Sequence, residues 1–455
     1  MLQLAPETVA SAVDDPTPVG IAGALSRLIA EGAVAPGERL PTVRDLAASL
    51  GVSPGTVSAA WQALASAGRI VTRGRAGSYV ADAGDTRLAP HTRRLAGHVP
   101  TTKLDLSRGT PDPDLLPPLR RAFERAAPHA ATASYHDEPV LPRLGRLLQE
   151  RWPTTGHRIT VVDGALDAID RVLQQVARYG DRIVVEQPSF PPLLDLAAHL
   201  RLEVLPVPVD REGIMPAALT QALSRAPRAL LMQPRAHNPT GVSTSPERIA
   251  ALAAAIRRSP AGRRIMVIED DHSGEIARGD LSSLAAFLPD QVVHVRSFSK
   301  SHGPDLRIAA LGGPAELIRA VEARRTLGPW WTPRLIQHSL AELLTDGEAV
   351  ASVARARATY AGRQRRFAEA LRRAGAGAPL PADGINAWVP VDDERAAILQ
   401  LATDGIRVAA GSAFYRDDRT ITVDGRDRIR VTVGAIAGDV EAVADAIAAA
   451  SRAPA

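Results

Sequence analysis

The spacing of apolar residues changes character along the chain. Between residues 18 and 81, apolar positions recur at helical intervals in three segments, 20–32, 40–51 and 53–68, and two short strand-like runs then flank a glycine-rich turn in 69–81. These patterns predict three helices followed by a β-hairpin. We therefore expect a small, helix-rich domain over residues 15–81.

The connection between the second and third predicted helices is very short. Ala47 precedes it, Gly51 lies in it and Val57 follows it, while Ser53 and Pro54 suit the N-cap and the first position of the third helix. Two helices that cross so closely need a small residue at the contact and a glycine where φ is positive. The spacing is typical of a helix-turn-helix, and a generic small helical domain is the alternative.

Strand-like and helical runs alternate through the rest of the chain, from about residue 104 to residue 455. Residues 82–103 show no sustained periodicity, and we interpret them as a linker. The alternation after the linker predicts an α/β domain built on a mostly parallel sheet. Its clearest β-branched runs are 157–164, 181–188, 228–234, 263–271 and 292–299.

Composition and charge narrow the class of protein. A chain of 455 residues, 45% hydrophobic and 23% charged, is long enough for at least two cores of a globular protein. The absence of cysteine excludes disulfides, thiolate catalysis and cysteine-ligated metals, and we expect no metal site. No apolar run approaches the roughly 18 residues of a membrane span, and the N-terminus lacks a signal-peptide pattern, so a cytoplasmic protein without a membrane partner is expected.

Basic residues are concentrated after the second predicted helix. Residues 1–50 carry three basic and six acidic side chains, whereas residues 51–103 carry seven basic and two acidic ones. Such a local excess indicates either a solvated face or an electrostatic footprint for an anionic polymer.

Lysine is rare in this chain, which points to amine chemistry at one position. Of 54 basic residues only Lys103 and Lys300 are lysines. A guanidinium stays protonated in proteins, whereas an ammonium can lose its proton and act as a nucleophile. Lys300 lies in "SFSK", directly after a predicted strand, where ligands of parallel sheets gather.

Polar and aromatic residues follow five of the predicted strands and form one chemical inventory. A phosphate group would need hydroxyls, an arginine and a helix N-terminus, and a protonated pyridine nitrogen would need a carboxylate. A phenolic oxygen would need hydrogen-bond donors, and the ring would need an aromatic side chain to stack on. With an amine for a Schiff base, this set is what pyridoxal phosphate requires. The candidates are Gly164, Ala165, Leu166, Phe190, Asn238, Asp270, His272, Ser297, Ser299, Lys300 and Arg307.

The N-terminal segment resembles the GntR type of winged helix-turn-helix. The resemblance rests on "LPTVRDLAASLGVSPGTVSAAWQAL", followed by a basic strand and "GRAGSYV", over some 60 residues. It implies that the third helix enters the major groove of double-stranded DNA by its N-terminal end and that a basic wing follows. The residues implied to meet DNA are Arg44, Ser53, Thr56, Ser58, Arg73, Arg75 and Gly77.

The larger segment resembles fold-type I aminotransferases over nearly its full length. This resemblance implies a mostly parallel sheet with flanking helices, a small C-terminal α+β subdomain and pyridoxal 5'-phosphate held by Lys300, with Asp270 at the ring nitrogen. His272 stands where such enzymes usually have tyrosine, so the second donor to the ring oxygen is either kept as an imidazole N–H or lost. By the same resemblance Asn238 donates to that oxygen and Phe190 stacks on the ring. The phosphate is held by Gly164, Ala165, Leu166, Ser297, Ser299 and Arg307. The resemblance also implies that Tyr135 reaches the phosphate bound by the partner subunit and that Arg430 binds a ligand carboxylate.

The order of the two segments resembles the MocR subfamily of transcription regulators. It implies a head-to-tail homodimer whose large domain senses an amine, an amino acid or pyridoxal phosphate itself and thereby changes DNA binding. Two alternatives stay open. The chain could be an active transaminase that carries a DNA-binding domain, or a cofactor-free regulator that uses the large domain only for dimerisation.

Overall fold

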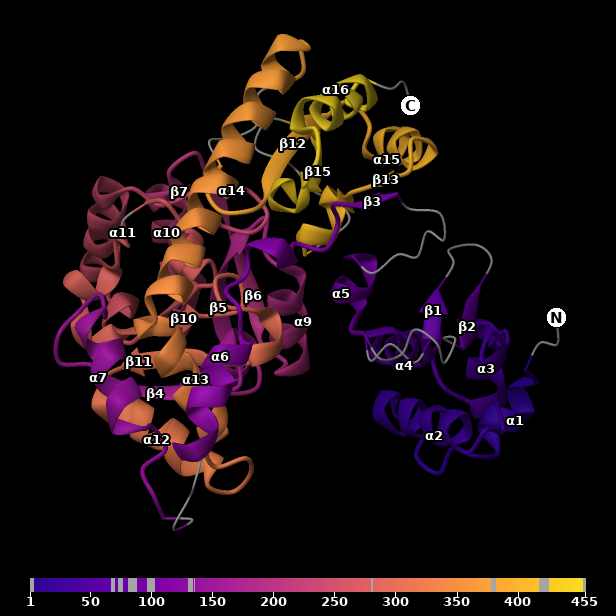
Figure 1. Cartoon of the computed structure of the whole chain (residues 1–455). Helices are drawn as coiled ribbons and strands as arrows, with labels where there is room; N and C mark the ends of the chain where they lie inside the picture. Colours follow the sequence, from indigo (N-terminus) through magenta and orange to yellow (C-terminus); the bar gives the residue numbers. More distant parts are fainter. Residues whose placement is uncertain are drawn as a thin grey trace. The chain divides into compact units, whose positions relative to one another are not determined.

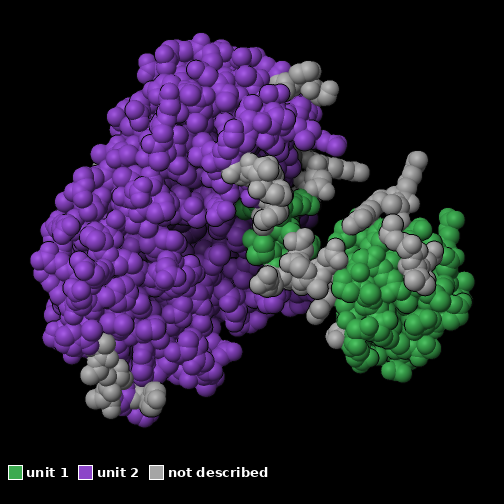
Figure 2. All heavy atoms as spheres, turned by 45° about the vertical axis from the view of Figure 1, so that its right-hand side comes forward, with its two compact units in different colours: residues 1–97 green, residues 98–455 purple. Residues whose placement is uncertain are grey.

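The computed structural model divides the chain into two compact units, residues 1–97 and 98–455 (Figure 2). The residues described are 4–66, 70–72, 77–80, 88–95, 103–129, 134, 136–279, 281–377, 382–416 and 425–452. Two predicted DNA-contacting residues, Arg73 and Arg75, and the predicted phosphate contact Tyr135 lie outside these ranges. Among the described residues, no helix combines the length and apolarity that crossing a membrane requires.

The first unit contains the three predicted helices and the hairpin (Figure 1). Leu46, Ala47 and Val57 belong to its buried core, because the helical spacing places them on the inner faces of crossing helices. A short helix within the expected linker was not predicted from periodicity. The elements are α1 (Pro6–Ala10), α2 (Pro18–Ala30), α3 (Val43–Leu50), α4 (Pro54–Ser66), β1 (Ile70–Thr72), β2 (Ser78–Val80) and α5 (Pro90–Leu95).

An eight-stranded sheet forms the centre of the second unit's described residues. Its order is β4-β11-β10-β9-β8-β5-β6-β7; β10, β9, β8, β5 and β6 are parallel neighbours, whereas β11 and β7 pair antiparallel. The runs predicted as strands are β4 (Arg158–Val162), β5 (Arg182–Gln187), β8 (Ala229–Met232), β9 (Met266–Asp271) and β10 (Val292–Ser297). The others are β6 (Glu203–Asp210), β7 (Gly213–Ile214) and β11 (Ala309–Gly313).

Helices cover both faces of this sheet. One apolar core joins it to α8 (Ala165–Val176), α9 (Pro191–His199) and α12 (Ala315–Arg325). On the other face two cores join it to α10 (Pro216–Leu223) and α11 (Pro246–Arg258), and to α6 (Arg120–Ala126), α7 (Pro142–Glu150) and α13 (Arg334–Thr345). Coverage on both sides explains why strands such as β8 are apolar without alternation.

A smaller α+β subdomain completes the second unit. Its three-stranded sheet, in the order β12-β15-β14, packs with helices around a separate core. β3 near the start of the unit pairs with β13, so the segment that leads to Ser107 and Gly109 is fixed to this subdomain. The elements are β3 (Leu104–Asp105), α14 (Gly347–Arg373), β12 (Ala387–Val391), α15 (Glu394–Thr403), β13 (Ile406–Arg407), β14 (Ala409–Ala410), β15 (Asp427–Val431) and α16 (Val440–Ala450).

Candidate functional site

The turn between α3 and α4 has the geometry of a helix-turn-helix. Gly51 ends α3 in the left-handed region, at φ +67°, where a Cβ would be strained. Ser53 Oγ accepts from the Thr56 backbone N–H at 3.2 Å and lies 2.9 Å from Thr56 Oγ1. Ser53 therefore caps the third helix and fixes the Thr56 side chain at its N-terminal end.

Of the residues predicted to meet DNA, Arg44 lies on α3 before this turn, Ser53 lies in it, and Thr56 and Ser58 follow it on α4. Arg44 and Ser53 are exposed, and Thr56 and Ser58 are partly exposed. Gly77 has φ +101°, and a Cβ there would approach Arg39 Nε to 3.2 Å. A side chain would thus crowd the hairpin as it enters β2.

Removing Arg44 or Thr56 is expected to weaken DNA binding without affecting the second unit. We expect Arg44→Ala and Thr56→Ala each to cost about 1–3 kcal/mol in binding free energy, because each removes a groove or phosphate contact. Fluorescence anisotropy with a duplex selected from a random pool by the wild-type chain measures this loss. Arg211→Ala, an exposed arginine of the second unit, is the matched control, and wild-type affinity in both reader variants would contradict the placement of the reader.

In the second unit, the N-terminus of α8 and Arg307 form an anion cradle. Gly164 precedes the helix at φ +111° and provides no side-chain cap, so the first-turn amides of Ala165 and Leu166 keep their free N–H groups. A Cβ on Gly164 would lie 2.5 Å from Arg307 Nη2, which itself donates to the Asp163 carbonyl at 3.3 Å. The guanidinium therefore lies directly over a helix N-terminus, an arrangement that favours phosphate.

The carboxylate of Asp167, in the first turn of α8, is paired with arginines. Its Oδ2 accepts from Arg171 Nε at 2.9 Å and from Arg325 Nη1 at 3.1 Å. Arg325 also donates to Asp163 Oδ2 at 3.3 Å. An acidic residue in the first turn of α8 is thus compatible with an anion at the helix N-terminus, because two arginines neutralise its charge.

Asp270, near the end of β9, is a buried carboxylate with one unpaired oxygen. Gln233 Nε2 donates to Asp270 Oδ2 at 2.8 Å, whereas Oδ1 has no hydrogen-bond partner among the described residues. Burial raises the pKa of Asp270 to about 7. A cationic N–H placed at Oδ1 would stabilise the charged form.

Gln233 and Glu186 are site residues that sequence reasoning did not single out. Gln233 Oε1 accepts from the Asn238 backbone N–H at 2.8 Å, and its own backbone N–H donates to Glu186 Oε2 at 2.7 Å. Burial raises the pKa of Glu186 well above its usual range. Gln233 therefore links Asp270 to Asn238; the only sequence signal was its position at the end of β8.

Replacing Gln233 is expected to weaken cofactor binding through Asp270. Gln233→Leu removes a hydrogen bond to a buried carboxylate, and we expect roughly tenfold weaker pyridoxal phosphate binding, since such bonds to charged groups contribute about 1.5–3 kcal/mol. An absorbance titration with pyridoxal phosphate measures this affinity. Gln174→Leu, at an exposed position on α8, should leave the affinity unchanged; equal affinities for the two variants would remove Gln233 from the site.

Lys300 lies close enough to Asp270 and Arg430 for their charges to affect its amine. Its Nζ donates to the Gly109 carbonyl, and Gly109 adopts φ +63°, with a would-be Cβ only 3.1 Å from Arg430 Nη1. Burial, followed by the positive charge of Arg430, lowers the pKa of Lys300 to about 8. The amine is therefore neutral in a larger fraction of molecules near pH 8 than an exposed lysine would be.

This lowered pKa predicts a pH dependence for the attachment of pyridoxal phosphate. Only the neutral amine attacks an aldehyde, so the rate should rise as the pH increases through about 8 and then level off. Stopped-flow absorbance between pH 6.5 and 10 checks it. A midpoint near the ordinary lysine pKa of about 10.4 would show that burial does not activate Lys300.

Arg430 on β15 is a buried guanidinium near Lys300. It is 1% exposed, donates from Nη1 to Asn238 Oδ1 at 3.0 Å and from Nη2 to the Ser107 carbonyl, and lies over the Phe414 ring. Its Nε has no partner in the described part of the chain, and burial lowers its pKa to about 9. Both acceptors of Arg430 are neutral, so neither compensates its charge.

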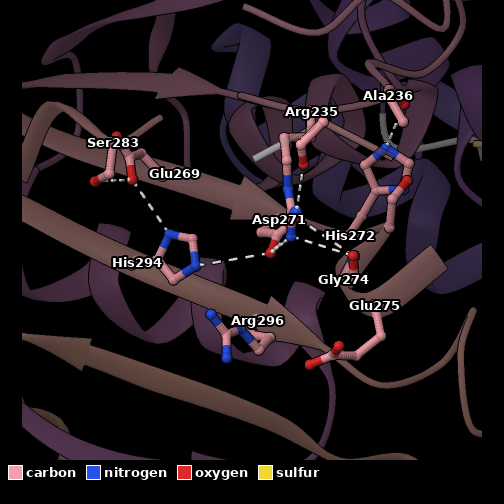
Figure 3. A network of polar contacts seen from close by, with 12 residues as sticks. Arg235, Ala236, Glu269, Asp271, His272, Gly274, Glu275, Ser283, His294 and Arg296 are labelled. Carbon is pink, nitrogen blue, oxygen red and sulfur yellow. Dashed lines mark hydrogen bonds and ion pairs between the residues drawn. The ribbon is translucent and has the colours of Figure 1, made fainter. Parts of the chain in front are cut away.

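His272 is committed to a backbone carbonyl. Its Nε2 lies 2.9 Å from the Ala236 oxygen, which can only accept, and burial lowers the imidazole pKa to about 4 (Figure 3). The neutral ring therefore carries its proton on Nε2, and the unprotonated Nδ1 lies 3.5 Å from Ser273 Oγ. In this arrangement His272 has no second N–H to donate to a ligand oxygen.

Phe190, Ser297 and Ser299 lie at the ends of strands or helices of the large sheet. Phe190 is the N-cap of α9 and packs against the core next to α8. Ser297 ends β10 and is buried, and its Oγ accepts from the Ser299 backbone N–H at 3.3 Å. Ser299 is thus held beside Lys300 by the turn that follows β10.

Comparison with known proteins accounts for both units. Residues 101–447 match the family described as aminotransferase class I and II, and residues 19–80 match the bacterial regulatory proteins of the gntR family. The vitamin B6 salvage pathway transcriptional repressor PtsJ of Salmonella typhimurium is 36% identical over 410 residues, which cover 88% of this chain and 92% of PtsJ. The chain belongs to the MocR-type transcription regulators.

Two further comparisons cover about three quarters of the chain. The HTH-type pyridoxine biosynthesis transcriptional regulator PdxR of Corynebacterium glutamicum is 29% identical, with 75% of this chain and 76% of PdxR covered. The kynurenine aminotransferase of Pyrococcus horikoshii superposes with a TM-score of 0.67 at 20% identity, over 78% of this chain and 91% of the enzyme, a likeness of fold. This MocR-type chain is a DNA-binding transcription regulator, and pyridoxal 5'-phosphate is the cofactor of its large domain.

Proposed function

We propose that this regulator binds pyridoxal phosphate at Lys300 and senses an amine that carries a carboxylate through Arg430. One observation carries the proposal: Arg430 is a fully buried cation with no carboxylate within ion-pair distance among the described residues. A buried, uncompensated charge is costly, and a carboxylate ligand would offset that cost with two-pronged geometry. Arg430 also lowers the pKa of Lys300, so the charge of one group acts on the other.

The residues of the pocket fit this cofactor. The unpaired Asp270 Oδ1 suits a protonated ring nitrogen, and the amide groups of α8 with Arg307 suit a phosphate. The side-chain oxygen of Asn238 accepts a hydrogen bond from Arg430. The side-chain NH2 group of Asn238 is therefore left to donate to another acceptor. With His272 bonded to Ala236, we propose that Asn238 is the side chain of this pair that donates to the ring oxygen.

The cofactor and the side chains of the protein contribute different parts of the proposed amine exchange. When bound, pyridoxal phosphate supplies an aldehyde carbon at which amines exchange. Lys300, with its lowered pKa, supplies the neutral amine and can take up a proton when an incoming amine replaces it. Asp270 holds the charge of the ring nitrogen, and Arg430 orients the incoming molecule by its carboxylate.

Sensing requires that the ligand favours one arrangement of the protein over another. A ligand changes DNA affinity only by the ratio of its affinities for the two arrangements. We propose that the regulator acts as a homodimer, in which exchange at Lys300 and Arg430 alters how the two readers are presented to DNA.

Matched ligand pairs test the carboxylate requirement. Each amino acid in a panel is titrated beside the amine that lacks its carboxylate, with the cofactor absorbance as readout. We expect one amino acid to shift the band at a concentration at least about 30-fold lower than its decarboxylated partner, the equivalent of about 2 kcal/mol from Arg430. Equal potency of the two partners would refute a carboxylate-directed sensor.

A second candidate signal is pyridoxal phosphate itself. The names of PtsJ and PdxR refer to vitamin B6 salvage and pyridoxine biosynthesis. If the cofactor is the signal, DNA affinity should change on addition of pyridoxal phosphate alone, and none of the amines should change it further.

A further inference from the structure

A second polar region lies across the sheet from the cofactor pocket. Asp270 and Asp271 are consecutive on β9, so their side chains point to opposite faces. In the parallel register His294 pairs with Glu269 and Arg296 with Asp271, which places these four side chains on one face (Figure 3). This polar set is therefore separated by the sheet from the Asp270 side.

The carboxylates of this set have polar partners within the protein. His294 Nδ1 lies 3.2 Å from Glu269 Oε2, which also accepts from Ser283 Oγ at 2.7 Å. Arg235 donates to both oxygens of Asp271, from Nη2 at 2.7 Å and from Nε at 3.2 Å (Figure 3). Asp271 is thus neutralised by Arg235 in a two-pronged pair.

Arg296 has no such partner. Its side chain donates from Nη2 to the Arg151 carbonyl at 2.8 Å and lies over the Trp152 ring, and only 7% of the residue is exposed. No carboxylate of the described residues lies within 4.0 Å of its guanidinium nitrogens. Burial lowers the pKa of Arg296, although the charges of Asp271 and Glu275 act in the opposite direction.

A surface cavity of about 310 Å³ lies against Arg296. Of the described residues that line it, Arg151, Arg235, Arg278, Arg296 and Arg357 are basic and Glu275 is acidic. Even with Asp271 included, five guanidinium groups face two carboxylates. Such a concave cluster of planar donors matches a multivalent oxyanion.

We propose that this cavity is a binding site for a small phosphorylated molecule, separate from the cofactor pocket. A volume of about 310 Å³ accommodates a phosphate or diphosphate group with part of a metabolite. A DNA backbone fits less well, because Arg296 and Arg235, whose side chain is 12% exposed, lie at positions that a rigid duplex cannot reach. Arg357, with 43% of its side chain exposed, forms the accessible side.

Inorganic pyrophosphate is the probe for this site. The full chain is first saturated with pyridoxal phosphate, which occupies the α8 cradle, and pyrophosphate is then titrated by calorimetry at constant ionic strength. We expect one saturable site per chain that chloride does not fill. Arg296→Gln should weaken binding roughly tenfold or more, through loss of a charge-assisted contact.

Two further variants keep the test decisive if the buried substitution impairs folding. Arg357→Gln, at the accessible side, should also weaken pyrophosphate binding, whereas Arg263→Gln, an exposed arginine elsewhere, should not. The cofactor absorbance should stay unchanged in all three variants, so failure here is distinguishable from failure at Lys300. Absence of saturable binding, equal affinity in the Arg296 and Arg357 variants and wild type, or an effect of these variants on DNA affinity alone would overturn the proposal.

Discussion

Substitution of Lys300 by alanine is expected to abolish covalent attachment of pyridoxal phosphate while the protein remains folded. Lys300 donates only to the Gly109 carbonyl in the described structure, and its side chain is not part of an apolar core. Its loss therefore removes the reacting amine without opening a large cavity. Phosphate contacts at α8 and Arg307 should still permit weaker, noncovalent binding.

Borohydride reduction followed by peptide mass spectrometry measures this directly. In the wild-type chain the cofactor mass should appear on the peptide that contains Lys300, and in Lys300→Ala on no lysine peptide. Lys103→Ala is an unusually close control, because Lys103 is the other lysine of the chain and is exposed. Labelling that disappears in Lys103→Ala instead would show that the attachment site is misassigned.

Substitution of Arg430 by glutamine is expected to abolish the response to a carboxylated amine. Glutamine retains hydrogen-bond donors but removes the buried charge, and truncation of one member of a buried charge pair costs about 2–5 kcal/mol. The effector concentration that shifts the cofactor band should therefore rise by a factor of roughly 30 or more. Attachment of the cofactor itself should persist, because Lys300 and Asp270 are unchanged.

Arg428→Gln on the same strand is the matched control for this variant. Arg428 is partly exposed and lies two residues before Arg430 on β15. Its substitution should leave the response intact. If the Arg430 variant responds to the carboxylated ligand as the wild type does, and still discriminates against the decarboxylated partner, another residue recognises the carboxylate.

Elements with a strong local signal could be predicted from the sequence. Pro54 begins α4, Ser53 caps it and Gly51 ends α3 with positive φ, because each position depends on one residue's own conformational preference. The apolar runs of β8 and β10 were equally clear. By contrast, β11 pairs antiparallel through "AALGG", and the short β3 pairs with β13 some 300 residues away; neither pairing has a local signature.

The reacting groups of the proposed site stand out in the sequence, whereas the groups that hold them do not. Lys300 and Asp270 stand out because an amine and a carboxylate at strand ends are chemically unusual. Gln233, Glu186 and Gly109 do not, since their roles depend on tertiary contacts. The orientation of His272 toward Ala236 likewise follows from the folded backbone, not from residue type.

In the proposed mechanism, ligand exchange at the large domain controls the DNA reader. To test it, the cofactor band and the DNA anisotropy are recorded on the same sample while a carboxylated amine is added. We expect the band to shift and then hold, and the DNA affinity to change over the same range of ligand concentration. A band that bleaches while keto acid accumulates, with constant DNA affinity, would contradict it and indicate a working transaminase.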